Sequence, residues 1–239
     1  MVASSGCAPV VIQSSDSVLI QAGPSANSHL SLESIIRPYR DSVSKEMDQI
    51  IGNSLVSMEK GKPESLLGNF ISDICMNRIN DSLASAGLPL LDLFVFNLGG
   101  LRGVIPQGPI KKGDIFQVMP FDNELVWVEI SHDSLLSLMG YISQRGGAPV
   151  SGLIMSIKDL NSQEVRLING KPIVPGEIYR IGTNDFLANG GDGMTMLSSP
   201  NGTHSVGIKV RDAIIDQIKV VQSRNGSIDS KLDMRIHGK

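Results

Sequence analysis

The stretch Leu91-Asp92-Leu93-Phe94-Val95-Phe96 is almost wholly apolar, and it runs into Asn97-Leu98-Gly99-Gly100-Leu101-Arg102. A short apolar run that ends at glycines is typical of a central β-strand leading into a loop. Loops at strand ends often carry binding residues, so we expect this one near a functional site. Gly99 and Gly100 would let the backbone approach a ligand, and the guanidinium of Arg102 would donate paired hydrogen bonds to phosphate or hydroxyl groups. On spacing alone, a tight turn with a solvated arginine is the simpler interpretation.

The segments on either side of this strand mix helical and strand-like patterns, with no long linker. They predict a single α+β domain over residues 31–239, with a mixed β-sheet and flanking helices, after an extended or disordered segment at residues 1–30. We expect helices at residues 38–51, 64–80, 131–143 and 206–221. We expect strands at residues 54–58, 91–96, 124–130, 152–158, 164–168, 177–183 and 232–236, with Asn169-Gly170 as a hairpin turn.

Composition limits the class of protein. The chain has 239 residues, 41% of them hydrophobic, and a formal net charge of −3. The apolar content excludes a disordered chain, and the lack of a basic surplus argues against a dedicated nucleic-acid binder. No apolar run is long enough to span a membrane.

The two cysteines call for different interpretations. Small residues precede Cys7, as in a bacterial lipoprotein cleavage site, but the basic and apolar regions of a signal peptide are missing. Cys7 is therefore either a lipid-anchor site in a truncated secretory precursor or an incidental residue after an expression start. Cys75 lies on the apolar stripe of the helix expected at residues 64–80, where a buried small hydrophobe is the simplest interpretation.

Two further loops combine aromatic and polar residues. Pro120-Phe121-Asp122-Asn123 places an aromatic ring and an amide in a turn before a strand, although a phenylalanine folded into the core is equally favoured. Residues 186–193, Phe-Leu-Ala-Asn-Gly-Gly-Asp-Gly, place Phe186 and Asp192 around permissive glycines. Taken alone, such a segment is more often a plain loop.

The histidines do not suggest a metal site. His29, His132, His204 and His237 lie singly, without a partner at metal-ligand spacing. We expect His132 to follow a helix cap and His204 to precede a helix. No nucleophile-elbow motif supports a Ser-His-Asp triad, so we assign no catalytic residue and no metal ligand.

Four motifs in order resemble the C-terminal domain of the 5′-nucleotidase family. They are the Glu64-Ser65-Leu66-Leu67-Gly68-Asn69 segment, the Asn-x-Gly-Gly-x-Arg loop, the Pro-Phe-x-Asn turn and the run from Asp185 to Gly193. The resemblance covers roughly residues 30–237. The family includes bacterial periplasmic UDP-sugar hydrolases and animal ecto-5′-nucleotidases, which implies a periplasmic or outer-membrane-associated location here.

The resemblance implies a role for each site residue. Phe121 and Phe186 would clamp a nucleobase from both faces, and Asp192 would accept hydrogen bonds from ribose hydroxyls. Arg102 would help to hold ribose or phosphate, while Asn97 and Asn123 match amides that contact the base or neighbouring polar atoms. Stacking tolerates any base, whereas a carboxylate selects the sugar.

Two features depart from the family pattern. At a position where the family usually has an arginine, this chain has Gly61, flanked by Lys60 and Lys62. A lysine would supply the positive charge but could not form the bidentate hydrogen bonds of an arginine. The metallophosphatase domain of full-length members, with its Asp-x-His and Asn-His-Asp/Glu motifs, is also missing. No cofactor is therefore expected in this chain, and divalent metals are expected only on a partner.

Three interpretations of the function follow. The first is the nucleotide-recognising half of a 5′-nucleotidase, acting with a separate metallophosphatase chain. The second is a stand-alone, non-catalytic nucleoside- or nucleotide-binding protein. The third is a retired domain kept for interaction.

Overall fold

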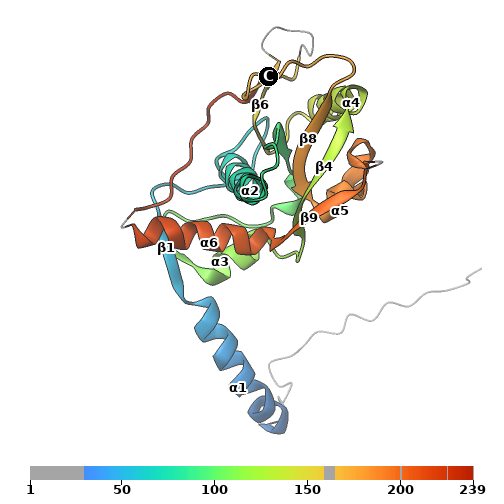
Figure 1. Ribbon diagram of the computed structural model, residues 1–239. Helices are drawn as coiled ribbons and strands as arrows, with labels where there is room; N and C mark the ends of the chain where they lie inside the picture. Colours follow the sequence, from blue (N-terminus) through green and yellow to red (C-terminus); the bar gives the residue numbers. More distant parts are fainter. Residues whose placement is uncertain (1–29, 159–164, 200, 225, 239) are drawn as a thin grey trace, which may run out of the picture. The chain divides into compact units, whose positions relative to one another are not determined.

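The computed structural model describes residues 30–158, 165–199, 201–224 and 226–238 (Figure 1). Its helices are α1 (Leu30–Met47), α2 (Leu66–Ser85), α3 (Lys112–Val118), α4 (His132–Gln144), α5 (Asp185–Ala188) and α6 (Val210–Ser223). Its strands are β1 (Ile50–Ser54), β2 (Leu93–Val95), β3 (Gly108–Lys111), β4 (Glu124–Ser131), β5 (Val150–Ser151), β6 (Leu153–Ser156), β7 (Arg166–Leu167), β8 (Ile178–Asn184), β9 (Thr203–Lys209) and β10 (Ile236–His237). Residues 43–239 form one compact unit, and the residues up to Ser42, which include most of α1, form another.

A five-stranded mixed sheet organises the larger unit, with strand order β5-β2-β8-β4-β9. β2 and β8 run parallel, and the pairs β2–β5, β4–β8 and β4–β9 are antiparallel. The carboxyl ends of β2 and β8 therefore meet at one edge of the sheet, and their amino ends meet at the opposite edge. Two smaller sheets, β1-β3 and β10-β6-β7, complete the unit.

Helices cover both faces of this sheet, with α2 on one side of β8 and β4 and with α4 and α5 on the other (Figure 1). On one face of the sheet, the alternation of side chains along β4 places Val126, Val128 and Ile130 in the core. On the other face, Gly182 leaves space for α2, since a Cβ atom at this position would lie 3.1 Å from Ile79 of α2 and 2.5 Å from Leu91. A glycine at this position lets α2 pack closely on the sheet.

The sequence predicted the fold class and several elements correctly. The structure confirms a mixed sheet with flanking helices. It also confirms the strands expected near residues 91–96 and 124–130, which are β2 and β4. It confirms that Ser131 caps α4, because its side chain accepts a hydrogen bond from the Ser134 N–H. α2 continues to Ser85, five residues past the predicted end, and Cys75 is buried on it.

The first predicted helix was misplaced. Pro38 lies inside α1 rather than at its first turn, and the helix ends at Met47. The strand expected at residues 54–58 was also misplaced, because β1 runs from Ile50 to Ser54 and shares only Ser54 with it. Gly52 does not stop a helix, because it lies in β1, where a Cβ atom would come within 2.4 Å of Ile218 of α6. A packing glycine and a helix-stop glycine look alike in sequence.

Three predictions in the carboxyl-terminal part of the chain also need correction. The helix expected from residue 206 begins at Val210, because residues 203–209 form β9 along the edge of β4. Asn169-Gly170 is a turn but not a hairpin, since β7 pairs with β6 while β8 pairs with β2 and β4. The strand expected at residues 232–236 is the short β10, which pairs with β6 and not with the five-stranded sheet.

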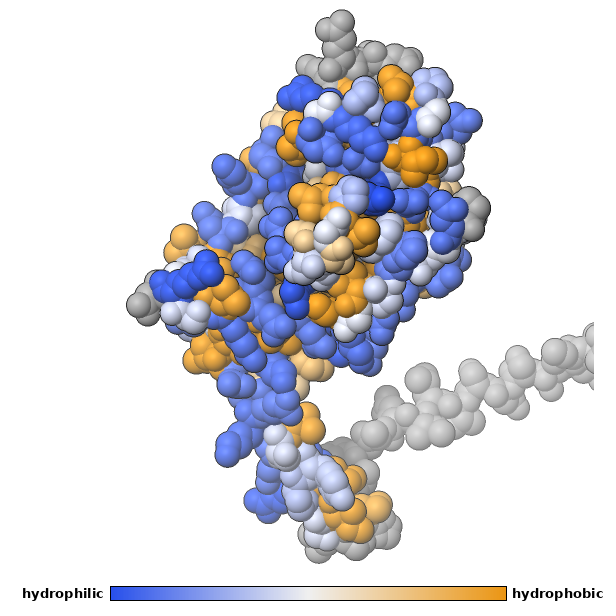
Figure 2. Space-filling model, in the orientation of Figure 1, coloured by the Kyte–Doolittle hydropathy of each residue, from blue (hydrophilic) through white to orange (hydrophobic). Residues whose placement is uncertain are grey.

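α1 presents an exposed apolar stripe. Figure 2 shows hydrophobic side chains as orange patches on this helix, and Leu32, Ile36 and Tyr39 are all exposed. None of the helices in the described part of the chain combines the length and apolar character needed to cross a membrane. The extended or disordered segment expected at residues 1–30, with Cys7 and His29, lies outside the described residues except for Leu30, which begins α1.

Candidate functional site

A cavity of about 550 Å³ opens at the edge of the sheet where β2 and β8 end. The loop after β2, the turn before β4 and the segment after β8 all contribute to it. Ligands commonly bind outside the carboxyl ends of parallel strands, where loops diverge. All eight residues selected from the sequence line this cavity, together with Asp122 and Asn184: Asn97, Gly99, Gly100, Arg102, Phe121, Asn123, Phe186 and Asp192.

Two phenylalanines from separate loops line the cavity with exposed rings. Phe121 is 44% exposed and Phe186 is 46% exposed, so neither is folded into the core. Phe186 lies in α5, whose first turn is capped by Asn184. A Cβ atom at Gly191 would come within 2.5 Å of the Phe186 ring, so the glycine there lets the ring lie against the following turn.

Asp192 sits in a left-handed conformation, with φ of 53°, between Gly190 and Gly193. Two contacts hold it there. Its carboxylate Oδ2 accepts a hydrogen bond from Asn97 Nδ2, and its backbone carbonyl accepts one from the Tyr141 hydroxyl at 2.8 Å. The carboxylate is thereby held at the cavity wall, where a ligand can reach it.

Tyr141 was not selected from the sequence. It lies on α4, 51 residues before Asp192, and nothing in its local pattern distinguishes it from a surface tyrosine of a helix. The guanidinium of Arg145 also lies over its ring, 5.1 Å from the centroid. The tyrosine acts on the site by positioning Asp192.

Arg102 is the cation that lines the cavity. Within the described part of the chain its guanidinium makes one long hydrogen bond, from Nη1 to the Gly99 carbonyl at 3.5 Å, which leaves most of its donors for an anion. Lys60 lies close to this loop, because its Nζ donates to the Leu101 carbonyl at 2.7 Å. Lys62 instead donates to the Arg145 carbonyl. Of the two lysines around Gly61, Lys60 is thus the one near Arg102.

The turn before β4 is held by polar contacts. Asn123 Nδ2 donates to Asp185 Oδ1 at 2.8 Å, which ties this turn to the start of α5. Asp122 forms ion pairs with Lys209, at 3.1 Å, and with Arg211. Hydrogen bonds from Lys209 and then Arg211 lower the pKa of Asp122, so this carboxylate stays ionised and its charge is balanced. Asp122 was missed as a cavity residue, although it stands between Phe121 and Asn123.

His132 and His204 each contact a neighbouring side chain of the fold. His132 is the first residue of α4, and its Nδ1 lies 3.1 Å from Asp133. His204 does not precede a helix, since it lies in β9 and stacks on Trp127 with ring centroids 4.0 Å apart. Over the described ranges, no three His, Cys, Asp or Glu side chains come together as metal ligands.

Comparison with known proteins places the chain in a family. The family model described as "5'-nucleotidase, C-terminal domain" matches residues 44–199. An apyrase from Tabanus yao is 25% identical over 77% of this chain and 38% of its own length, and a 5′-nucleotidase from Diplobatis ommata is 24% identical over 78% and 37%. The crystal structure of a 5′-nucleotidase precursor from Thermus thermophilus is 27% identical, with a TM-score of 0.67 over 87% of this chain and 43% of that one. The chain thus spans less than half the length of these relatives.

Proposed function

Because the chain belongs to the family of 5′-nucleotidase C-terminal domains, we propose that its cavity recognises a nucleoside or nucleotide. The observation that carries this proposal is the pairing of two exposed aromatic rings, Phe121 and Phe186, with the carboxylate of Asp192 in one cavity. The base of a nucleotide is recognised by stacking, its sugar by hydrogen bonds to hydroxyls and its phosphate by positive charge. The cavity has residues suited to each of these contacts.

The base is assigned to the two phenylalanines. Every nucleobase has a π-face, so stacking on aromatic rings contributes affinity with little base preference. Asn123 and Asn97 line the same cavity, and we assign them to polar edges of the base. The cavity volume of about 550 Å³ is within the range of small-molecule sites.

The sugar and phosphate are assigned to charged groups. Asp192 can accept hydrogen bonds from two vicinal hydroxyls, and such charge-assisted bonds are stronger than neutral ones. Arg102, with its nearly free guanidinium, is assigned to phosphate or ribose oxygens. Because Lys209 and Arg211 balance the charge of Asp122, this carboxylate does not repel an anionic ligand.

The hydrolytic step is assigned to a partner. Since no metal-ligand cluster occurs within the described residues, this part of the chain offers no fitting site for catalytic metals, and we assign it no step through them. We propose that a metallophosphatase partner supplies the metals and the attacking water, while this domain positions the substrate. An extracytoplasmic location and a lipid anchor at Cys7 stay predictions from the sequence.

Asp192→Asn tests the assignment of the sugar. The substitution keeps the shape but removes the charge, so adenosine should lose about 1 to 2 kcal/mol more affinity than 2′-deoxyadenosine. Calorimetric titration of both ligands into both proteins measures the difference. Asp133→Asn is the matched control, because it removes the same charge from an exposed residue of α4 that does not line this cavity. The control should affect both ligands alike, and equal losses in Asp192→Asn with a lowered Tm would make Asp192 structural only.

The partner proposal is tested by phosphate release. The pure chain with Mn²⁺ is expected to release no phosphate from AMP, and mixing with a candidate metallophosphatase chain should produce release that depends on Phe121 and Phe186. Chelator-sensitive AMP hydrolysis by the pure chain would contradict the division of roles. Ligand binding without release in any mixture would instead favour a stand-alone binding protein.

A further inference from the structure

A second, larger cavity of about 710 Å³ lies at the other end of the sheet. Asp92 directly precedes β2, and Ile178 and Arg180 lie at the start of β8. Because these two parallel strands carry the first site at their carboxyl ends, the two cavities are separated by the length of the strands. One can therefore be filled without blocking the other.

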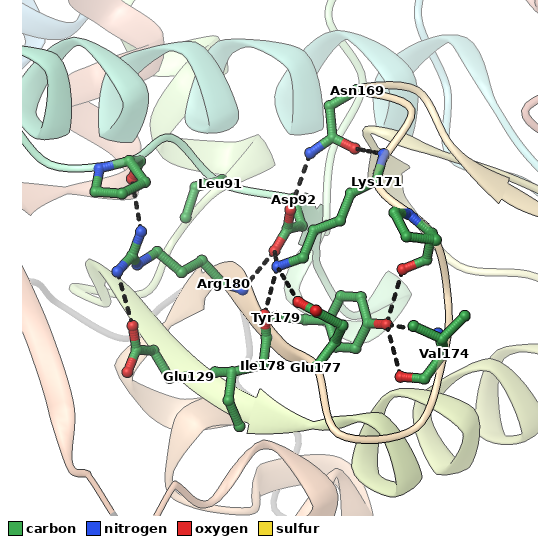
Figure 3. Close-up of polar contacts among 12 residues, drawn as sticks. Leu91, Asp92, Glu129, Asn169, Lys171, Val174, Glu177, Ile178, Tyr179 and Arg180 are labelled. Atoms are coloured by element: carbon green, nitrogen blue, oxygen red, sulfur yellow. Dashed lines mark hydrogen bonds and ion pairs between the residues drawn. The ribbon is translucent and has the colours of Figure 1, made fainter.

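Figure 3 shows the polar floor of this second cavity, centred on Asp92. The Asp92 side chain is buried, and it accepts hydrogen bonds from Asn169 Nδ2 at 2.9 Å, the Arg180 N–H at 2.8 Å and Lys171 Nζ at 3.3 Å. Lys171 also donates to the Ile178 carbonyl and lies over the Tyr179 ring at 4.7 Å. The Lys171 ammonium lies 3.3 Å from Asp92 Oδ2 and 3.9 Å from Glu177 Oε2, so the charged groups of this floor already have partners.

Arg180 and Asn80 both carry hydrogen-bond donors that lack a close acceptor among the described residues. Arg180 pairs with Glu129 Oε1 at 2.9 Å, but its Nη1 has only a long contact of 3.4 Å to the Pro89 carbonyl, and its buried Nε has no partner among the described residues. Asn80 uses its Oδ1 to accept from the Leu91 N–H, and within the described ranges its amide N–H groups have no acceptor. A guanidinium with unused donors favours an acceptor, best of all a carboxylate.

The rim of the cavity is aliphatic. Leu90, Ile168 and Ile178 come from three separate segments, and all three are exposed although they are large hydrophobic residues. Exposed apolar side chains that gather around a cavity, rather than being scattered, indicate a surface that is covered by a ligand. The ligand should thus carry a short aliphatic chain as well as an acceptor group.

We propose that this cavity is a second ligand site, which binds a small aliphatic carboxylate. The carboxylate accepts hydrogen bonds from Arg180 Nη1 and from the Asn80 amide, and the aliphatic chain covers Leu90, Ile168 and Ile178. This site is independent of the nucleoside proposal, since it shares no lining residue with the first cavity.

Titration of hexanoate into the full chain, followed by amide chemical shifts in NMR, tests the proposal. Saturable shifts are expected for residues 90–92, 168–171 and 178–180. Acetate, which lacks the aliphatic chain, and hexylamine, which reverses the charge, should not produce them. The same shifts are expected when adenosine is already bound, so failure of the nucleoside proposal would leave this result untouched.

Asn80→Asp gives the sharper comparison. The aspartate can still accept from the Leu91 N–H, but it replaces the donor with a negative charge and should weaken hexanoate about tenfold or more. Asn77→Asp is the matched control, because it makes the same change on an exposed position of the same helix and should leave affinity unchanged. Absence of saturable shifts at this cavity, equal affinity in Asn80→Asp, or displacement of hexanoate by adenosine would each overturn the proposal.

Discussion

Replacing both Phe121 and Phe186 by alanine is expected to weaken adenosine binding by about 2 to 6 kcal/mol, because each ring contributes roughly 1 to 3 kcal/mol of stacking. Both rings are exposed at the cavity, so their removal creates no void in the core. The unfolding temperature should stay close to that of the parent chain. Calorimetric titration of the parent, the two single variants and the double variant measures the loss.

Tyr39→Ala is the control for this prediction, because Tyr39 is also an exposed aromatic residue and lies on α1, outside the cavity. Its replacement should leave adenosine affinity unchanged. If the double variant binds adenosine as tightly as the parent while remaining folded, the phenylalanines do not hold the base, and the proposed function loses its main support.

Arg235→Met is expected to lower the free energy of unfolding by about 1 to 3 kcal/mol, since it removes a largely buried guanidinium from two partly exposed carboxylates and a buried carbonyl. The Arg235 side chain is only 10% exposed, and its Nη1 donates to Asp73 at 2.7 Å and to the Val150 carbonyl at 2.9 Å. It also forms two bonds to Asp233, from Nε at 2.8 Å and from Nη2 at 2.7 Å. The arginine thereby joins the carboxyl-terminal segment to α2 and β5. Denaturant unfolding monitored by circular dichroism measures the change.

The effect of Arg235→Met should depend on pH. The hydrogen bond from Arg235 lowers the pKa of Asp233, so this pair stabilises the fold above the ordinary aspartate pKa of about 3.9 and loses that contribution as the pH falls through the lower folded-state value. The difference between variant and parent should therefore shrink below about pH 4. Arg37→Met, at an exposed position of α1, should change stability by less than about 0.5 kcal/mol at any pH. A pH-independent deficit in Arg235→Met would mean that packing, not charge, is lost.

The sequence pointed to the residues of the first cavity because its loops match, in order, the motifs of the family that the chain resembles. Phe121 and Asn123 share one turn, and Phe186 and Asp192 share one glycine-rich segment. The conformational freedom of glycine and the order of the motifs are readable without tertiary contacts. Tyr141 and Asp122 were not selected, because their roles depend on partners 51 and 87 or more residues away.

The second cavity shows the opposite case. Asn80, Asp92 and Arg180 belong to a helix, a loop and a strand, and no local pattern relates them. Asp92 looked like one polar residue in an apolar strand, whereas in the structure it receives hydrogen bonds from residues 77 to 88 positions away. Unused donors such as those of Arg180 can be recognised only when every neighbour is known.

What the sequence by itself determined about this protein is the α+β class and the helices and strands with strong periodicity, such as α2 and β4. Those features depend on local backbone preference and on the alternation of apolar side chains, which neighbouring residues set. Only the tertiary structure decided that residues 203–209 form an edge strand, that Gly52 is a packing glycine, and that Asp192 is held by Tyr141. Each of these depends on a contact between segments far apart in the chain, and such long-range pairing overrides weak local preference.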